Sequence, residues 1–153
     1  MIQPIKKAWR AFVLPLLQRP KRLQVAALCY RHGEKGDKEV LLITSRGTGR
    51  WVIPKGWPMR GLGSPDAAMQ EAWEEAGVIK AQLERTPIGS YSYDKIKKTG
   101  LAQPVNVMVY PAIVMQIVDH FPEADQRKRI WVSPLEAATM VHEPGLQSIL
   151  RSF

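Results

Sequence analysis

The stretch GWPMRGLGSPDAAMQEAWEEAGV, residues 56–78, specifies one helix together with both of its ends. We expect Ser64 to cap the helix, since a serine hydroxyl can accept a backbone N–H, with a proline at the first helical position. Gly77 suits the opposite end, because glycine readily takes the left-handed conformation that closes many helices. The sequence therefore predicts a helix that runs from Ser64 through Glu75 or Ala76.

The predicted helix carries three carboxylates on one face. Glu71, Glu74 and Glu75 have the spacing i, i+3 and i+4, which places them one above another. Like charges so spaced destabilise a helix by about 0.2–0.5 kcal/mol per pair, and the helix dipole disfavours anions near the C-terminal end. A sequence that accepts both penalties favours a bound cation, and oxygen ligands suit Mg²⁺ or Mn²⁺ rather than zinc. An acidic face exposed to solvent and paired with lysines is the alternative that the helix alone leaves open.

The segments on either side of this helix favour a sheet that the helix covers. Ala68, Ala72 and Ala76 recur every four residues on the opposite face, so the helix can pack closely. Strand-like composition occurs at 23–31, 39–45, 51–53, 88–98, 105–118 and 129–132, a glycine- and proline-rich loop at 55–63, and further helices at 133–136 and 145–152. The first two strands form a hairpin, and Pro111 predicts an edge or a bulge in the longest strand. These elements predict a mixed α/β layered domain.

The same stretch resembles the signature of the Nudix hydrolase superfamily, G-x5-E-x7-R-E-U-x-E-E-x-G-U, in which U is a bulky apolar residue. With Gly56 as its first glycine, the matching positions are Glu71, Glu74, Glu75, Gly77 and Val78. The approach PKGW at 54–57 looks like that of members acting on diphosphoinositol polyphosphates and dinucleoside polyphosphates. The resemblance covers about residues 22–150. It implies a Nudix-type α/β/α sandwich around a mixed β-sheet, with the hydrolase domain at 23–153 behind a basic N-terminal extension at 1–22.

The signature is degenerate at two positions that the family uses as an acid–base pair. Leu62 replaces its first glutamate, Gln70 replaces its arginine, and Ala72 is small for an apolar position of the signature. The family pair commonly braces the loop against the helix, and losing both members avoids leaving one buried charge unpaired. We expect apolar packing of Leu62 to hold the loop instead. The resemblance thus implies a modified site rather than an inactive one.

The resemblance also implies roles for the three glutamates. Glu74 and Glu75 would bind the metal directly, helped by the backbone carbonyl of Lys55, while Glu71 would bind a second metal or orient the attacking water. Family members often add one more acid from a loop after the long strands. Glu123 and Asp125 are the candidates here, and each taken alone is better explained as an ordinary loop acid.

A phosphate-rich substrate also requires cations, and basic residues flank the predicted loop. The candidate substrate-binding residues are Arg46, Arg50, Lys55, Lys95 and Lys97, with Trp57 as a residue that could stack on a base. Solubilising surface charge is the alternative for the cations, and core packing is the alternative for the tryptophan.

The net charge of +8 belongs mainly to residues 1–22, which hold six basic side chains and no acidic one. The remaining 16 basic and 14 acidic side chains nearly balance, which weakens an argument for nucleic-acid binding by the whole domain. Residues 1–22 could contact an anionic membrane, or pack on their own domain. No apolar run approaches the length of a membrane span. The single cysteine, Cys29, is expected to be buried and inert, so a cytoplasmic location is predicted.

Together these features predict a metal-dependent hydrolase that cleaves a diphosphate linkage in a nucleoside-diphosphate-X or diphosphoinositol-type substrate. Its partner would be a phosphorylated small molecule rather than nucleic acid. The alternative, which Leu62 and Gln70 motivate, is a non-catalytic Nudix-fold module that binds a nucleotide or RNA. The sequence does not determine the oligomeric state.

Overall fold

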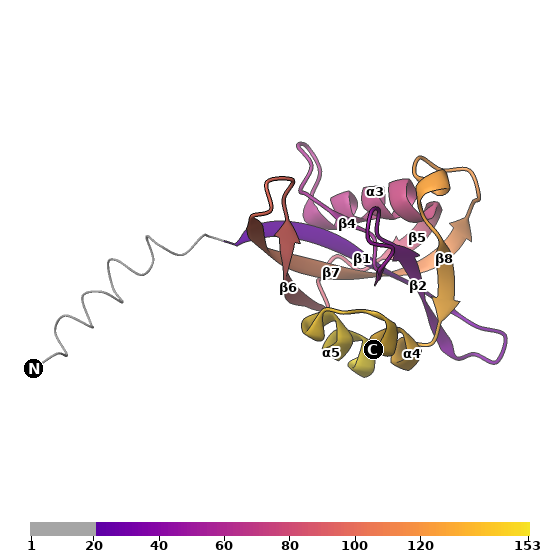
Figure 1. Cartoon of the computed structure of the whole chain (residues 1–153). Coiled ribbons are helices and arrows are strands. Elements are labelled where there is room, and N and C mark those ends of the chain that lie inside the picture. Colours follow the sequence, from indigo (N-terminus) through magenta and orange to yellow (C-terminus); the bar gives the residue numbers. More distant parts are fainter. Residues whose placement is uncertain (1–20) are drawn as a thin grey trace, which may run out of the picture.

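The computed structural model describes residues 21–153, which form helices on both faces of one sheet (Figure 1). Helix α3 (Ser64–Ala76) covers one face, and α4 (Pro134–Met140) and α5 (Pro144–Ser152) cover the other. This confirms the predicted α/β/α sandwich. The predictions made for the basic extension, membrane contact or packing on the domain, fall mainly on residues 1–20, outside the described residues.

The sheet is mixed, because the long central strands β1 and β7 run parallel and the other pairs are antiparallel. Its order is β3-β2-β1-β7-β5, with β4 paired to β1, β6 to β7 and β8 to β2. The strands are β1 (Arg22–His32), β2 (Lys38–Thr44), β3 (Trp51–Val52), β4 (Lys55–Gly56), β5 (Val78–Leu83), β6 (Gly89–Ile96), β7 (Ala102–Ile117) and β8 (Arg129–Val132), and a short 3-10 helix, η2, spans Ala124–Gln126.

Two strands were missed by the sequence analysis. The first, β5, follows α3 directly, but its exposed Lys80 and Gln82 give it little of the apolar pattern that marks a strand. The second, β4, lies within the predicted 55–63 loop, where Lys55 pairs with Ala26 of β1. This pairing draws the start of the loop onto the sheet beneath α3.

The prediction that Pro111 marks an edge or a bulge is wrong. Strand β7 is central, with β1 on one side and both β6 and β5 on the other. The carbonyl oxygen of Pro111 accepts the N–H of Glu84 at 2.9 Å, and that of Val109 accepts the N–H of Ile88 at 2.8 Å. Pro111 therefore faces the turn between β5 and β6, where one partner strand ends and the next begins, so its missing N–H is tolerated.

Helix α3 has the predicted bounds, but its N-cap differs from the prediction. Gly63, not Ser64, is the N-cap, and no side chain caps this end. Gly77 closes the other end in the left-handed conformation, with φ of 73°. The predicted alanine face is fully buried on β1, where its neighbours include Cys29. Burial raises the pKa of the Cys29 thiol to about 12, as expected of an inert cysteine.

Strand β1 is buried on both of its faces, which explains its continuous apolar sequence. Val25 and Ala27 point into the core beneath α3, whereas Ala26 and Leu28 point into the core beneath α4 and α5. Between residues 21 and 153 no helix has both the length and the apolar character required to cross a bilayer.

Gly77 provides a test of how tightly α3 is joined to the loop that follows β7. A Cβ at this position would lie 2.5 Å from the Val118 carbonyl oxygen, whereas a Cβ on Gly36, which has a similar φ of 81°, would meet nothing within 4 Å. We expect Gly36→Ala to lower the free energy of unfolding by about 1 kcal/mol through backbone strain. We expect Gly77→Ala to lower it by about 3 kcal/mol, because overpacking adds to that strain. Urea denaturation measures both, and equal losses would contradict the close approach.

Candidate active site

The three glutamates of α3 line one cavity of about 640 Å³ beside the loop at 55–63 that precedes the helix. Because the alanine face of α3 is buried on β1, the carboxylates of Glu71, Glu74 and Glu75 are directed along the helix side that faces β4. The structure thus brings together the residues for which the sequence predicted a catalytic and metal-binding role.

Glu71 lies against the backbone of Gly56. A Cβ added to Gly56 would overlap the Glu71 carboxylate, so glycine at this position leaves the space that the carboxylate occupies. Among residues 21–153 no hydrogen bond reaches this carboxylate. Its pKa is raised to about 7, first by burial and then by the negative charges of Glu75, Glu74 and Glu123.

Glu75 is the most buried of the three carboxylates and is held at both oxygens. Its Oε2 accepts the backbone N–H of Lys55 at 3.0 Å, and its Oε1 accepts Nη2 of Arg127 at 3.0 Å. Burial nevertheless raises the pKa of Glu75 to about 7, against the opposing effects of Arg127 and Lys55. The Glu75 side chain therefore fastens the backbone at the start of the 55–63 loop to α3.

Arg127 is the main residue that the sequence analysis missed. Its side chain is only 7% exposed, and it donates to Glu75, to Glu123 and, at 2.9 Å, to the backbone oxygen of Thr44. In the sequence it belongs to a basic run that looks like ordinary surface charge. The one feature of the sequence that points to Arg127 is its i, i+4 spacing from Glu123, which predicts an ion pair only if the segment forms a helical turn.

Of the two candidate loop acids, Glu123 lines the cavity and Asp125 does not. Glu123 lines the same cavity as the three glutamates, and its backbone N–H donates to the carbonyl oxygen of Glu74 at 3.0 Å. Its Oε1 is shared by Arg127 at 3.1 Å and Arg46 at 3.2 Å. Asp125 is exposed and lines a separate hollow.

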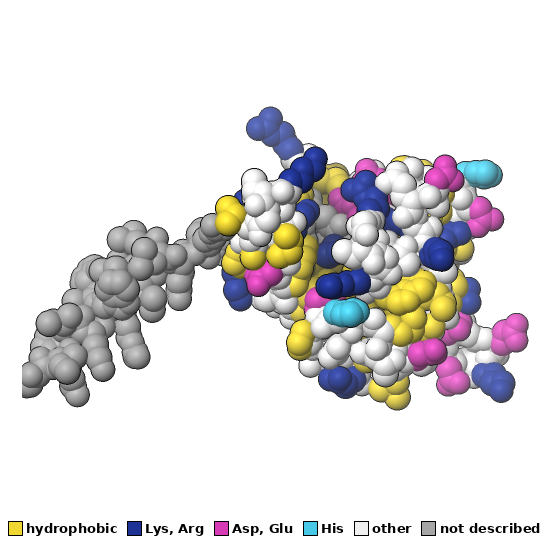
Figure 2. All heavy atoms as spheres, in the orientation of Figure 1, with side chains coloured by type: hydrophobic (Ala, Val, Ile, Leu, Met, Phe, Trp, Pro, Cys, Tyr) yellow, Lys and Arg dark blue, Asp and Glu magenta, His cyan; other side chains and the backbone are white. Residues whose placement is uncertain are grey.

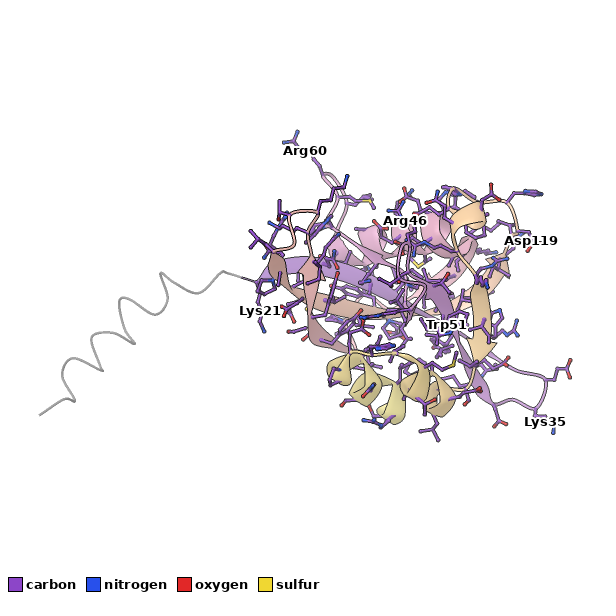
Figure 3. All side chains as sticks on the ribbon, in the orientation of Figure 1. Lys21, Lys35, Arg46, Trp51, Arg60 and Asp119 are labelled. Carbon is purple, nitrogen blue, oxygen red and sulfur yellow. The ribbon has the colours of Figure 1, made fainter. Side chains whose placement is uncertain are left out.

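Most of the predicted substrate-binding residues line the cavity as well: Arg46, Arg50, Lys55, Trp57 and Lys95. Lys97 does not, because it belongs to the turn between β6 and β7. Figure 3 shows Arg46 over the domain near α3, whereas Arg60 projects from the loop into solvent. On the face seen in Figure 2, basic and acidic side chains are interspersed.

Two cationic side chains lie near the ring of Trp57. The Arg22 guanidinium lies 4.3 Å and the Lys95 ammonium 5.1 Å from the ring centroid. Trp57 also packs against the core, so the packing alternative holds for part of the side chain. A role in stacking on a base stays a prediction.

The expected packing of Leu62 is wrong. Leu62 is 45% exposed, because it follows the exposed tip of the loop. The apolar anchor of the loop is Met59, which packs against the core beneath α3. Gln70, which replaces the signature arginine, instead donates to Oε1 of Glu74 at 3.1 Å. At the end of the loop, Gly63 lies against an exposed ion pair in which Arg85 contacts Asp66 at 2.9 Å.

The donor set fits a divalent cation chemically, although the side chains do not already converge on one point. Within residues 21–153 no group of three or more histidine, cysteine or acidic side chains has a geometry ready to hold an ion. The donors that the cavity offers are carboxylate oxygens, which suit Mg²⁺ or Mn²⁺. The negative charges of Glu74, Glu75 and Glu123 around Glu71 favour a cation at this place.

A substitution of Arg127 tests how much its contacts with Glu75 and Glu123 contribute to stability. We expect Arg127→Met to lower the free energy of unfolding at neutral pH by about 3 kcal/mol, because Glu75 and Glu123 would lose a buried partner. Arg85→Met is the matched control, since it breaks an exposed ion pair and should have a much smaller effect. Urea denaturation of both variants is the measurement. Similar losses would mean that Arg127 contributes no more than a surface charge.

Comparison with known proteins identifies the family of the chain. Residues 22–153 match the family model of the NUDIX domain. The chain is 31% identical over 135 residues to chloroplastic Nudix hydrolase 21 of Arabidopsis thaliana, covering 86% of this chain and 66% of that protein. It is 30% identical over 134 residues to diphosphoinositol polyphosphate phosphohydrolase 3-beta of Bos taurus, covering 82% of this chain and 76% of that protein.

Solved structures show the same fold. A C. elegans Ap4A hydrolase, in a binary complex, superposes with a TM-score of 0.64 at 23% identity, over 86% of this chain and 94% of that one. The NUDIX domain of Shewanella oneidensis NrtR, in complex with ADP ribose, gives a TM-score of 0.63 at 17% identity, over 96% of both chains. The homologues indicate a Nudix phosphohydrolase, as the sequence predicted. The family model and the curated relatives together show that this chain belongs to the Nudix hydrolase family.

Proposed function

We propose that this chain catalyses metal-dependent hydrolysis of a diphosphate linkage in a phosphorylated small molecule. The observation that carries the proposal is the set of three α3 glutamates in a cavity that five cationic side chains also line. Names of relatives support the same substrate range, since one is a diphosphoinositol polyphosphate phosphohydrolase and another an Ap4A hydrolase. The proposed substrate is therefore a nucleoside-diphosphate-X or diphosphoinositol-type compound, acted on in the cytoplasm.

The proposed metal ligands are the three glutamates and the backbone carbonyl of Lys55. Glu123 is proposed as a further ligand through Oε2, because Arg46 and Arg127 share its Oε1. Bound Mg²⁺ or Mn²⁺ would neutralise the diphosphate and lower the pKa of a water ligand. Nη2 of Arg127 donates to both Glu75 and Glu123, which keeps both carboxylates in position beside the loop.

The charge of the cavity supports a requirement for metal. Five cationic side chains and six carboxylates line it, so the cations do not outnumber the acidic groups that an anionic substrate would meet. The cations, which include Arg46, Arg50 and Lys95, can bind the phosphates that are not cleaved. The carboxylates need a divalent cation between them and the phosphate, because like charges would otherwise repel.

In the proposed reaction, Glu71 orients a water molecule and accepts its proton. The water oxygen forms a bond to phosphorus while the bridging P–O bond on the opposite side breaks, and the departing phosphate keeps the bonding electrons. Gln70 holds the Glu74 carboxylate in place, and Lys55 and Arg127 hold that of Glu75. The half-buried position of Glu71, against Gly56, supports this role because it limits where the carboxylate can point.

Neutral glutamine variants test the assignment of the carboxylates. With Mg²⁺, and with diadenosine tetraphosphate, ADP-ribose and diphosphoinositol pentakisphosphate as substrates, we expect Glu74→Gln to lower kcat by about 100-fold or more. Outer-shell partners of metal ligands already contribute 10- to 100-fold, and a ligand should contribute more. Glu84→Gln, an exposed residue remote from the cavity, should retain the full rate. A chelator should abolish turnover.

Equal rates for wild type and Glu74→Gln would rule out the proposed site. Salt-sensitive binding of ADP or RNA that needs no metal, in a protein without turnover, would instead favour the non-catalytic module.

Gly56 allows a second test that leaves every carboxylate in the chain. We expect Gly56→Ala to lower kcat by about 10-fold or more, because the new methyl group would displace the Glu71 carboxylate. Gly89→Ala is the control, since a Cβ there would meet Ile149 only at an ordinary 3.4 Å. Steady-state kinetics measures kcat for both variants, and thermal unfolding checks that both are folded. A fully active Gly56→Ala enzyme would show that the position of Glu71 is unimportant.

A further inference from the structure

Glu143 lies in the short segment between α4 and α5, and its Oε2 is buried without a hydrogen-bond partner. Across the described residues 21–153 it is the only buried side-chain oxygen or nitrogen in that state. An acidic residue just before a helix commonly accepts an N–H of the first turn, but the Glu143 side chain makes no such bond to α5. A buried carboxylate oxygen without a donor is unfavourable, so its presence calls for a donor from outside the chain.

The backbone that carries Glu143 is held by the packing of α5 on β6. A Cβ on Gly145 would lie 2.6 Å from the Cβ of Tyr91, so glycine allows the helix to approach the strand closely. Nε2 of Gln147 donates to the carbonyl oxygen of Val141 at 2.9 Å and closes the segment around Glu143. The carboxylate is therefore placed by the fold.

Glu143 lines the same cavity as the three α3 glutamates but comes from the opposite face of the sheet (Figure 1). Two polar side chains near Glu143, Tyr93 and Lys55, do not donate to its Oε2. The Tyr93 hydroxyl donates to Oε1 of Gln24 at 2.7 Å. Burial lowers the pKa of Lys55 while the charges of Glu75 and Glu143 oppose that effect, yet Lys55 makes no ion pair with Glu143 within the part of the chain that the structure describes.

We propose that Glu143 selects the non-reacting end of the substrate by accepting hydrogen bonds from N–H or O–H groups of a nucleoside. This assignment rests on the proposed hydrolase function and narrows its substrate class to nucleoside polyphosphates. A cavity of about 640 Å³ has the size of ordinary small-molecule sites. The phosphates would lie toward Arg46 and Arg50, and the nucleoside toward Glu143.

The same carboxylate disfavours a diphosphoinositol substrate. Such a ligand carries phosphate groups around its ring, and a phosphate facing Glu143 would bring two negative charges together where little water screens them. A neutral base or ribose presents hydrogen-bond donors and no charge. Glu143 therefore combines an attraction for one substrate class with a repulsion against the other.

The test compares kcat/KM for diadenosine tetraphosphate and diphosphoinositol pentakisphosphate, with Mg²⁺, in wild type, Glu143→Gln and Glu143→Lys. We expect the wild type to prefer the nucleotide. Glu143→Gln should raise KM for the nucleotide by about 10- to 100-fold with little change in kcat, as for loss of a hydrogen bond to a charged group. Glu143→Lys should increase kcat/KM for the inositol compound. Glu136→Gln, an exposed residue of α4 outside the cavity, should match the wild type.

Binding and stability measurements separate failure of this assignment from failure of the hydrolase proposal. Calorimetric titration with ADP and with inositol hexakisphosphate reports the selectivity even if no variant turns over substrate, in which case only the hydrolase proposal fails. Urea denaturation should show Glu143→Gln at least as stable as wild type, because an unpaired buried charge is removed. Unchanged ADP affinity in Glu143→Gln, or a parallel loss of stability and of binding to both ligands, would overturn the role of Glu143.

Discussion

The mutual repulsion of the carboxylates on one face of α3 is the constraint on which the surrounding structure depends. The alanine face fixes the helix on β1, so the glutamates cannot move apart by tilting the helix. Their charge is offset instead by Arg127, by the N–H of Lys55 and by the amide of Gln70. Gln70 belongs to α3 itself, whereas Lys55 and Arg127 come from two other segments, and each of these two contacts fastens its segment to the helix. The acidic face therefore organises the loop before α3, the loop before β8 and the helix itself into one site.

What the sequence predicted correctly was local. The face shared by Glu71, Glu74 and Glu75, the closure of α3 at Gly77 and the alanine packing face all follow from spacing along one helix. Arg127 lies 52 residues from Glu75, and no periodicity links the two positions. Strand β5 was missed for a related reason, since it is defined by pairing with β7 rather than by its own apolar pattern.

The sheet explains why residues so distant in sequence share a cavity. Because β1 and β7 are parallel and buried, helices must cover both faces, and α3 and α5 approach the same end of the sheet from opposite sides (Figure 1). Glu71 and Glu143 therefore reach one cavity from different layers. The sequence analysis predicted the helix at 145–152 but not that Glu143, just before it, lines the cavity, because no pattern along the chain relates that residue to α3.

The two degenerate signature positions lie outside this cavity. Leu62 and Gln70 line a shallow hollow on the outer side of α3 with Met69 and Trp73, and the catalytic candidates do not border it. The bracing that the family obtains from an acid–base pair is supplied here by Met59 in the core and by contacts of the loop backbone with Glu75. Met59 and the contact with Glu75 hold the loop on the side that faces the core. Loss of the acid–base pair on the outer side of α3 therefore affects how firmly the loop is held more than it affects the positions of the carboxylates. A degenerate signature and an intact carboxylate face are therefore compatible in one molecule.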